Sequence, residues 1–293
     1  MKMCKKAAYT MPGMFVTDFD GTLLTDEKQI HQQDLDTLAG LRTAGIVTVI
    51  ATGRSLFSFK RALTQMGLEQ KDLPVDYLIF STGAGIQCLK TDSLIRSYAI
   101  SIEGIRKIIA YFDSLGFDYM VHKAVPDTPH FLFRSNSQTN PDFEHRIRLY
   151  PDFGSPLNGN DDLFKQATEV LAIVPGGLPR SQVNAIQSDL SEFSVIHATS
   201  PLDHQSSWIE VFHPKVSKSS SADWLVRHLD LSQASVTAVG NDYNDEDLLE
   251  WSGNAFLVEN GPKDLKGRFK AVASNNACGV TQAVRDSGLL TGA

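Results

Sequence analysis

Two carboxylates stand two residues apart near the start of the chain, in Asp18-Phe19-Asp20-Gly21. The apolar residues 14–16 before them predict a short buried strand, and Gly21 predicts a tight turn at its end. Because ligands bind at the carboxyl ends of strands in open α/β sheets, we expect Asp18 and Asp20 to face one site. One carboxylate could act as nucleophile and the other as acid/base, with a hard cation bridging them. Ordinary turn-forming aspartates are the alternative.

Three further polar stretches occupy similar places along the chain. They stand at predicted strand ends or at a predicted helix start: Thr52-Gly53-Arg54, Lys218, and the run Asn241, Asp242, Asn244 and Asp245. Together they offer a hydroxyl, backbone amides, a lysine and more carboxylates. That set suits phosphoryl transfer, in which positioning and charge stabilisation do most of the catalysis. The alternatives are Thr52 as a helix cap and Lys218 as a solvated lysine, although a cation in a first helical turn opposes the helix dipole.

The elements that must position these residues alternate between strand and helix. Apolar runs rich in β-branched residues predict further strands at 46–51, 76–80, 235–239, 254–258 and 271–273. Helical periodicity predicts helices at 31–44, 55–66, 219–230, 246–252, 262–269 and 278–287. This order predicts an α/β fold with a doubly wound parallel sheet.

The pattern changes to a more antiparallel one between residues 86 and 212. We expect helices at 101–114 and 180–193, strands at 117–122, 130–134, 169–174, 194–198 and 208–212, and a polar loop at 135–162. An α+β module at 86–212 is therefore predicted within a core of residues 1–85 and 213–293. Linkers near 84–87 and 211–215 would let the module open and close. His130, Phe131, Phe133 and Arg134 are candidates to line its pocket, with core strand residues as the alternative for the aromatics.

Composition narrows the functional class. The chain has 293 residues, of which 42% are hydrophobic and 21% charged, as in ordinary globular proteins. Its net charge of −7 argues against binding to nucleic acid, so an anionic substrate needs a local positive site. No apolar run approaches the ~20 residues that span a bilayer, and the first thirteen residues lack a signal-peptide core.

Cysteine and histidine usage adds a prediction about compartment and metal ligands. Cys4, Cys88 and Cys278 lie far apart, which predicts a reduced, cytoplasmic compartment and no thiolate metal site. None of the eight histidines pairs with another at metal-ligand spacing, so we expect each to be structural or exposed.

The motifs together resemble those of the haloacid dehalogenase superfamily, and in particular its Cof-type phosphatases. The resemblance spans the whole chain and is carried, in order, by Asp18-Phe19-Asp20-Gly21-Thr22-Leu23, Thr52-Gly53-Arg54, Val216-Ser217-Lys218 and Gly240 to Asp245. It implies a Rossmann-like core with an inserted type IIB cap. It also implies Mg²⁺-dependent hydrolysis of a small phosphorylated metabolite, usually a sugar phosphate, with no nucleic-acid or membrane partner. The oligomeric state is left open.

The resemblance assigns a role to each motif residue. Asp18 would attack phosphorus to form an aspartyl-phosphate, Asp20 would serve as acid and then base, and Lys218 would neutralise negative charge. The implied magnesium ligands are Asp18, Asp20, Asn241 and Asp245. The implied phosphate and substrate ligands are Gly21, Thr52, Gly53, Arg54 and Asn244.

Two positions depart from the family pattern. Asn241 stands where relatives usually have Asp, which keeps an oxygen ligand but removes a negative charge from the metal site. Asp242 and Asp245 are the candidates to compensate, and the family spacing favours Asp245. Thr82 stands where relatives often have Asn. A phosphomutase of the same chemistry and a phosphate-binding protein with weakened turnover are the alternative functions.

Overall fold

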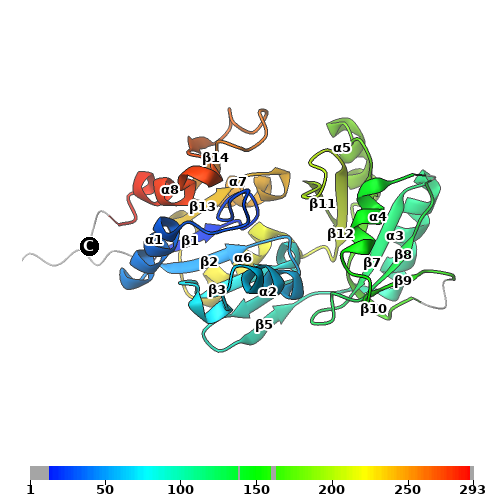
Figure 1. Cartoon of the computed structure of the whole chain (residues 1–293), viewed down its shortest axis with the longest axis horizontal. Helices are drawn as coiled ribbons and strands as arrows, with labels where there is room; N and C mark the ends of the chain where they lie inside the picture. Colours follow the sequence, from blue (N-terminus) through cyan, green and yellow to red (C-terminus); the bar gives the residue numbers. More distant parts are fainter. Residues whose placement is uncertain (1–12, 138, 160–162, 291–293) are drawn as a thin grey trace, which may run out of the picture.

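The computed structural model describes residues 13–137, 139–159 and 163–290, which form two α/β units that lie next to each other (Figure 1). The larger unit is the predicted doubly wound sheet and the smaller is the predicted insertion, so the fold class is confirmed. Cys4, on which part of the compartment prediction rests, lies outside the described residues. Among those residues, no helix combines the length and the apolar character that crossing a membrane requires.

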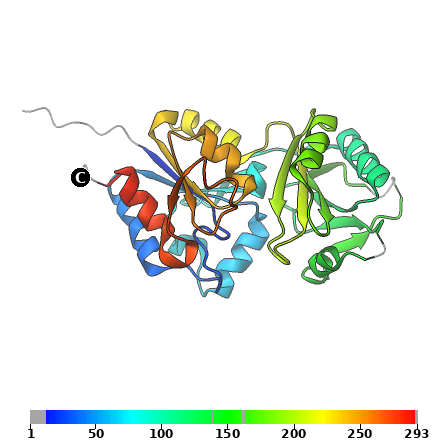
Figure 2. The same ribbon diagram turned by 90° about the horizontal axis from the view of Figure 1, so that it is seen from above.

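The core is one eight-stranded sheet with helices on both faces (Figure 2). The strand order is β15-β14-β13-β1-β2-β3-β4-β5, and all strands except β4 and β5 pair in parallel. The strands are β1 (Met14–Thr17), β2 (Val47–Ala51), β3 (Tyr77–Phe80), β4 (Gly85–Cys88), β5 (Ser93–Ser97), β13 (Val236–Gly240), β14 (Asn254–Val258) and β15 (Lys270–Val272). The helices are α1 (Gln32–Thr43), α2 (Leu56–Gln65), α6 (Lys218–His228), α7 (Glu246–Trp251) and α8 (Gly279–Ser287).

Strand β1 is buried on both faces of this sheet. Phe15 packs with α1, α2 and α8 on one face, whereas Met14 and Val16 pack with α6 and α7 on the other. Alternation of side chains along a strand explains why an unbroken apolar run is needed here. The carboxyl end of β1 lies between β2 and β13, so the loops after these three strands meet at one edge.

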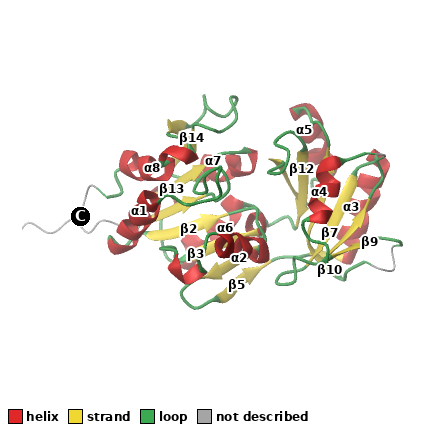
Figure 3. Cartoon of the chain, in the orientation of Figure 1, coloured by secondary structure: helices red, strands yellow, loops and turns green. Residues whose placement is uncertain are grey.

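The cap is a second, mostly antiparallel sheet in the order β11-β12-β10-β7-β8-β9, with β6 pairing β10 (Figure 3). Its strands are β6 (Ile100–Ser101), β7 (Asp118–Lys123), β8 (Phe131–Arg134), β9 (Gly154–Pro156), β10 (Gln166–Val174), β11 (Ser194–Thr199) and β12 (Ser207–Phe212). Its helices are α3 (Ile102–Leu115), α4 (Pro141–Arg148) and α5 (Arg180–Asp189). Helices α3 and α5 cover one face of the sheet, and α4 packs on the other.

The core sheet extends beyond the boundary predicted at residue 85. Strands β4 and β5 pair antiparallel with β3 and with each other, and Tyr98 N still donates to Ala84 O (2.9 Å). Hydrogen bonding to the free edge of β3 decides this, and the local residue pattern does not reveal it. We infer that the cap begins at residue 100 rather than 86, so the first linker lies near 98–99 rather than 84–87.

Two predictions of local structure are wrong. The loop predicted at 135–162 contains α4 and β9, because Asn140 caps α4 by accepting from Phe143 N (3.2 Å) and Pro141 begins the helix. Those start signals were hidden in a polar stretch. The helix predicted at 262–269 is instead a series of turns, in which Leu265 N bonds Pro262 O and Arg268 N bonds Leu265 O.

Five short 3₁₀ turns complete the described elements. They are η1 (Gln70–Asp72), η2 (Ser81–Gly83), η4 (Gln233–Ser235), η5 (Tyr243–Asp245) and η6 (Asn275–Ala277). Two of them belong to the predicted site region, since η2 follows β3 and η5 follows β13.

The cap contacts the core on both sides of the loop that follows β1. On the β2 side, Tyr150 Oη lies 3.3 Å from Ser58 Oγ, and Arg61 donates to Leu149 O at 3.2 Å. On the β13 side, Arg180 donates to both carboxylate oxygens of Glu246 at 2.8 and 2.9 Å. The cap therefore contacts the core on both sides of the sheet edge that carries the loop after β1.

Candidate active site

The loop after β1 places Asp18 and Asp20 at the carboxyl edge of the sheet. Asp18 N continues the strand by donating to Val239 O of β13 at 2.9 Å, and the residue is only 3% exposed. Gly21 then turns the chain with a φ of +72°, which favours glycine. A Cβ at this position would also lie 2.6 Å from the Asn241 side chain, so Gly21 is needed for space as well as for conformation.

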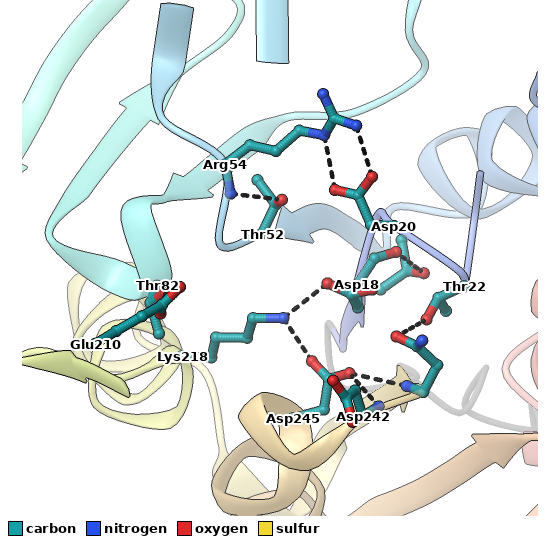
Figure 4. Close-up of polar contacts among 12 residues, drawn as sticks. Asp18, Asp20, Thr22, Thr52, Arg54, Thr82, Glu210, Lys218, Asp242 and Asp245 are labelled. Carbon is teal, nitrogen blue, oxygen red and sulfur yellow. Dashed lines mark hydrogen bonds and ion pairs between the residues drawn. The ribbon is translucent and has the colours of Figure 1, made fainter. Parts of the chain in front are cut away.

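Lys218 binds two carboxylates at once (Figure 4). Its Nζ donates to Asp18 Oδ1 at 2.7 Å and to Asp245 Oδ1 at 2.5 Å, and its side chain has no exposed surface. Ser217 caps α6 by accepting from Ser220 N, which fixes Lys218 in the first turn. The alternative of a solvated Lys218 is therefore excluded by geometry.

The charges in this group shift each other's protonation. Burial lowers the pKa of Lys218, but the neighbouring charges of Asp18 and Asp245 outweigh burial and raise it above its ordinary value. Burial and the charge of Asp245 raise the pKa of Asp18, and Lys218 opposes them. The lysine is consequently held as a cation next to the candidate nucleophile.

Asp20 faces a different cation. Arg54 donates to both oxygens of Asp20, from Nε at 2.7 Å and from Nη2 at 2.7 Å. Burial lowers the pKa of Arg54, but Asp20 more than offsets it and raises that pKa. This two-bond geometry holds the carboxylate in a defined plane beside Asp18.

Thr52 points into the site rather than capping the next helix. It is 1% exposed, and its Oγ1 accepts from Arg54 N at 3.1 Å. The cap of α2 is Ser55, which accepts from Ser58 N at 3.2 Å. Asn244 lies across from this loop, since its Nδ2 would be 3.7 Å from a Cβ on Gly53. The candidate Gly53 after β2 thus lies close to the candidate Asn244 in the loop after β13.

The loop after β13 turns its two acidic residues in different directions. Asp245 is fully buried and accepts from Asn241 N at 2.8 Å and Asp242 N at 3.2 Å, in addition to Lys218. Asp242 instead accepts from Thr199 N of the cap at 3.0 Å. Asp245 therefore organises the loop and the lysine, and Asp242 contacts the cap.

We infer that the donor set for a divalent cation is made of oxygens from Asp18, Asp20 and Asn241. The fourth predicted ligand, Asp245, instead bonds Lys218 and two backbone amides. The terminal amide atom of Asn241 lies 3.1 Å from Asp18 Oδ2 and 3.0 Å from the carbonyl oxygen of Asp20. With Oδ1 in that place, three oxygens meet at the ~3 Å spacing of neighbouring ligands around Mg²⁺, whose Mg–O distance is ~2.0–2.1 Å. The residues therefore fit Mg²⁺. Within the described ranges, no three His, Cys, Asp or Glu side chains form a metal cluster, as expected for a set with a carbonyl and an amide.

The sequence analysis missed a polar group that the cap brings to the site. Glu210 of β12 accepts from Thr82 Oγ1 at 3.0 Å, beside Lys218 (Figure 4). Glu169 of β10 is its neighbour on the same face of the cap sheet, and His122 pairs with Glu169 in register on β7. Two glutamates interrupting otherwise apolar buried strands were the signal that could have revealed them.

These cap residues have strongly shifted pKa values. Burial and the charge of Glu210 raise the pKa of Glu169 to about 8, and burial raises that of Glu210 to about 7. Burial and the charge of Arg146 lower the pKa of His122 to about 3, so its ring is neutral. His122 Nδ1 lies 3.0 Å from Thr128 O. Its Nε2 has no hydrogen-bond partner among the described residues and lies 3.7 Å from Glu169 Oε1.

The cap residues singled out from sequence have mainly structural contacts. Phe131 and Phe133 belong to the apolar cluster under α4, as the alternative for the aromatics expected. Arg134 forms an ion pair with Asp113 of α3 at 2.8 Å. His130 packs edge-on against the ring of Phe153.

Comparison with known proteins gives one family. A model for haloacid dehalogenase-like hydrolases matches residues 15–284. YxeH of Bacillus subtilis (strain 168) is 24% identical over 286 residues, which cover 93% of this chain and 97% of that protein. The 5-amino-6-(5-phospho-D-ribitylamino)uracil phosphatase YitU of the same organism is 24% identical over 284 residues, covering 94% and 98%.

Solved structures share the two-unit fold. BT1666 from Bacteroides thetaiotaomicron, described among phosphatases of the haloalkanoate enzyme superfamily, aligns with a TM-score of 0.74 at 17% identity and covers 98% of each chain. The subclass IIB sugar phosphatase BT4131 aligns with a TM-score of 0.70 at 16% identity, over 94% of this chain and 99% of that one. Both likenesses extend through the inserted cap.

Proposed function

This chain belongs to the family of haloacid dehalogenase-like hydrolases, and we propose that it is a phosphatase that hydrolyses a small phosphomonoester through an aspartyl-phosphate on Asp18. The observation that carries the proposal is the contact of Lys218 Nζ with Asp18 at 2.7 Å in a fully buried position. A lysine there lowers the repulsion between a carboxylate nucleophile and an anionic phosphate. We also place the protein in the cytoplasm, on the spacing of its cysteines.

In the first half-reaction, a carboxylate oxygen of Asp18 bonds to phosphorus while the bond from phosphorus to the alcohol oxygen breaks. Asp20, once it has left its ion pair with Arg54 and taken a proton from solvent, gives that proton to the leaving oxygen. Because both oxygens of Asp20 accept from Arg54 in the described arrangement, Asp20 must turn from the guanidinium as substrate binds. Arg54 is then free to donate to a phosphate oxygen.

In the second half-reaction, Asp20 takes a proton from water, and the water oxygen bonds to phosphorus as the bond to Asp18 breaks. Inorganic phosphate leaves and the Asp18 carboxylate is restored. We expect Thr52 and the backbone amides of Gly21 and Gly53 to bind phosphate oxygens. Magnesium, when bound by Asp18, Asp20 and Asn241, supplies positive charge that draws the phosphate toward Asp18. The cap excludes bulk water from this step.

The cap supports a leaving group rich in hydrogen-bond donors, of which a sugar or other polyol is the simplest. Glu169 and Glu210 offer carboxyl oxygens on the face that meets the core, and Arg146 adds a donor whose Nε has no partner among the described residues. Two of the relatives are named for phosphorylated sugar or ribityl substrates. We therefore propose a sugar or polyol phosphate as the substrate class.

The test is release of phosphate from a panel of phosphorylated metabolites with Mg²⁺, by wild type, Asp18→Asn and Asp20→Asn. Asp18→Asn should lose turnover entirely while keeping its fold by circular dichroism. Asp20→Asn should lose about 10²–10⁴-fold, the usual contribution of general acid/base catalysis. Substantial phosphate release by purified Asp18→Asn would refute the nucleophile assignment.

The neutral Asn241 favours one competing function, a phosphate-ligand-binding protein with weakened turnover. Tight binding of a phosphorylated metabolite by calorimetry, with no phosphate released by wild type or by Asn241→Asp, would establish that function instead. A rearranged phosphorylated product without free phosphate would identify a phosphomutase.

A further inference from the structure

The side-chain amide of Asn241 lies where hydrogen-bond acceptors outnumber donors. One of its two terminal atoms is 3.1 Å from Asp18 Oδ2, 3.0 Å from the Asp20 carbonyl oxygen and 3.2 Å from Thr22 Oγ1. A carboxylate oxygen and a carbonyl oxygen only accept hydrogen bonds, so this position requires either a donor or a nearby cation. The missing Cβ of Gly21 leaves room for the amide to sit there.

An amide can meet that requirement in both ways, whereas a carboxylate can meet it in only one. With Nδ2 at the shared position, its two N–H groups lie within reach of Asp18 Oδ2, Asp20 O and Thr22 Oγ1, and donate to two of these acceptors at a time. With Oδ1 there, it accepts from Thr22 Oγ1 and joins two other oxygens around a cation. An Asp at 241 could provide the second arrangement but not the first, because it has no donor when ionised.

We propose that Asn241 substitutes for the divalent cation in the metal-free protein, and that its amide turns over to become an oxygen ligand when the cation binds. This inference rests on the magnesium site of the proposed function. Compared with the family's usual Asp, Asn241 therefore stabilises the metal-free site and weakens cation binding. The metal-free site keeps its hydrogen bonds, and cation binding must break those bonds before it can form new contacts.

The charges around the site support this role of Asn241 in the metal-free protein. Three carboxylates, Asp18, Asp20 and Asp245, are matched by two directly bonded cations, Lys218 and Arg54. An Asp at 241 would add a fourth negative charge about 3 Å from Asp18 with no added cation, which costs stability unless metal is present. With Asn241, the core therefore folds whether or not the metal is bound.

The experiment compares thermal unfolding of wild type, Asn241→Asp and Asn241→Ala in chelator and across a Mg²⁺ titration. In chelator, both variants should melt below wild type by at least about 2 °C, since each loses the donor. Added Mg²⁺ should raise the melting temperature of Asn241→Asp more than that of wild type, at a concentration about tenfold lower. Asn254→Asp, the same change at an exposed residue of β14, controls for the added charge.

A second measurement follows the amide itself. In ¹⁵N spectra, the Asn241 side-chain signals, identified by their loss in Asn241→Asp, should be protected from exchange in chelator and lose that protection on adding Mg²⁺. The proposal is overturned if both variants are as stable as wild type in chelator, or if the exchange protection of the amide signals does not change when Mg²⁺ is added. These readouts need no turnover, so a failure of the proposed phosphatase activity is seen separately in the phosphate-release assay.

Discussion

The core and the cap each bury a pair of carboxyl groups, and the two pairs are neutralised differently. In the core, Lys218 Nζ lies within 2.7 Å of both Asp18 and Asp245. In the cap, neither Glu169 nor Glu210 has a lysine or arginine nitrogen within 4.0 Å, among the residues that the structure describes. The positive charges of Lys218 and Arg146 act on Glu210 only from longer distances. Arg146 acts on Glu169 in the same way.

The core pair is therefore preorganised, whereas the cap pair has no directly bonded cation. The core carboxylates have their cation in place before substrate arrives, which is the arrangement that electrostatic catalysis requires. The cap glutamates are kept near neutrality by burial, and their oxygens remain able to bind a donor-rich group. We therefore propose that the core supplies the catalytic groups and that the cap decides which substrate binds.

The strongest way to break the comparison is Lys218→Met, which removes the cation from the core pair. Because two carboxylates would stay buried without it, we expect the free energy of unfolding to fall by roughly 3–5 kcal/mol and turnover to be lost. Denaturant unfolding and phosphate release measure the two effects. Lys215→Met, at an exposed position three residues earlier, should change neither. Wild-type stability in Lys218→Met would show that the core pair does not depend on the lysine.

Within the core, Asp245→Ala should be far more harmful than Asp242→Ala. Asp245 holds Lys218 and two backbone amides, whereas Asp242 holds the cap residue Thr199. We expect Asp245→Ala to raise the Mg²⁺ concentration for half-maximal turnover by about 10–100-fold. Asp242→Ala should change it by about fivefold or less, as for one lost hydrogen bond. The opposite order would mean that Asp242 supports the metal site.

In the cap, Glu210→Gln should change selectivity rather than chemistry. We expect kcat/KM for polyol phosphates to fall roughly tenfold, mostly through KM, because an acceptor oxygen of the carboxyl group is replaced by an amide nitrogen that can only donate. With p-nitrophenyl phosphate, whose leaving group offers no such donors, the loss should be less than about twofold. Equal losses on both substrates would assign Glu210 to closure through Thr82 rather than to substrate binding.

The smallest expected effect is on the pH dependence of stability, in Glu169→Gln. The folded protein holds the Glu169 proton up to a pKa of about 8, whereas the unfolded chain releases it near 4.5. Native protein therefore binds more protons across that window, and stability falls as pH rises through it. Glu169→Gln should remove this loss and melt above wild type at pH 8 but not at pH 4. Glu27→Gln, at an exposed site, is the control, and a pH-independent difference would contradict the shift.

Local sequence determined the core elements and the residues of the catalytic edge. Apolar runs such as 14–16 and 46–51 have to be strands buried on both faces, and the polar groups that follow them have to meet at one edge. For this reason Asp18 and Thr52 were predicted to share a site without a structure. Lys218 was added to that prediction from its place at the start of a helix. Helix start signals within a polar stretch do not distinguish a helix from a loop, which is why α4 was predicted as loop.

Tertiary structure decided the features that depend on contacts between distant segments. The pairing of β4 and β5 with the edge of β3 moved the cap boundary, because strand partners are chosen across the sheet and not along the chain. The opposite directions of Asp242 and Asp245 follow from their partners on the cap and on α6, respectively. The spacing of Asp242 and Asp245 in the sequence gives no information about either partner. Glu210 likewise reaches the site only because β12 is folded over the core, so its role was decided by packing alone.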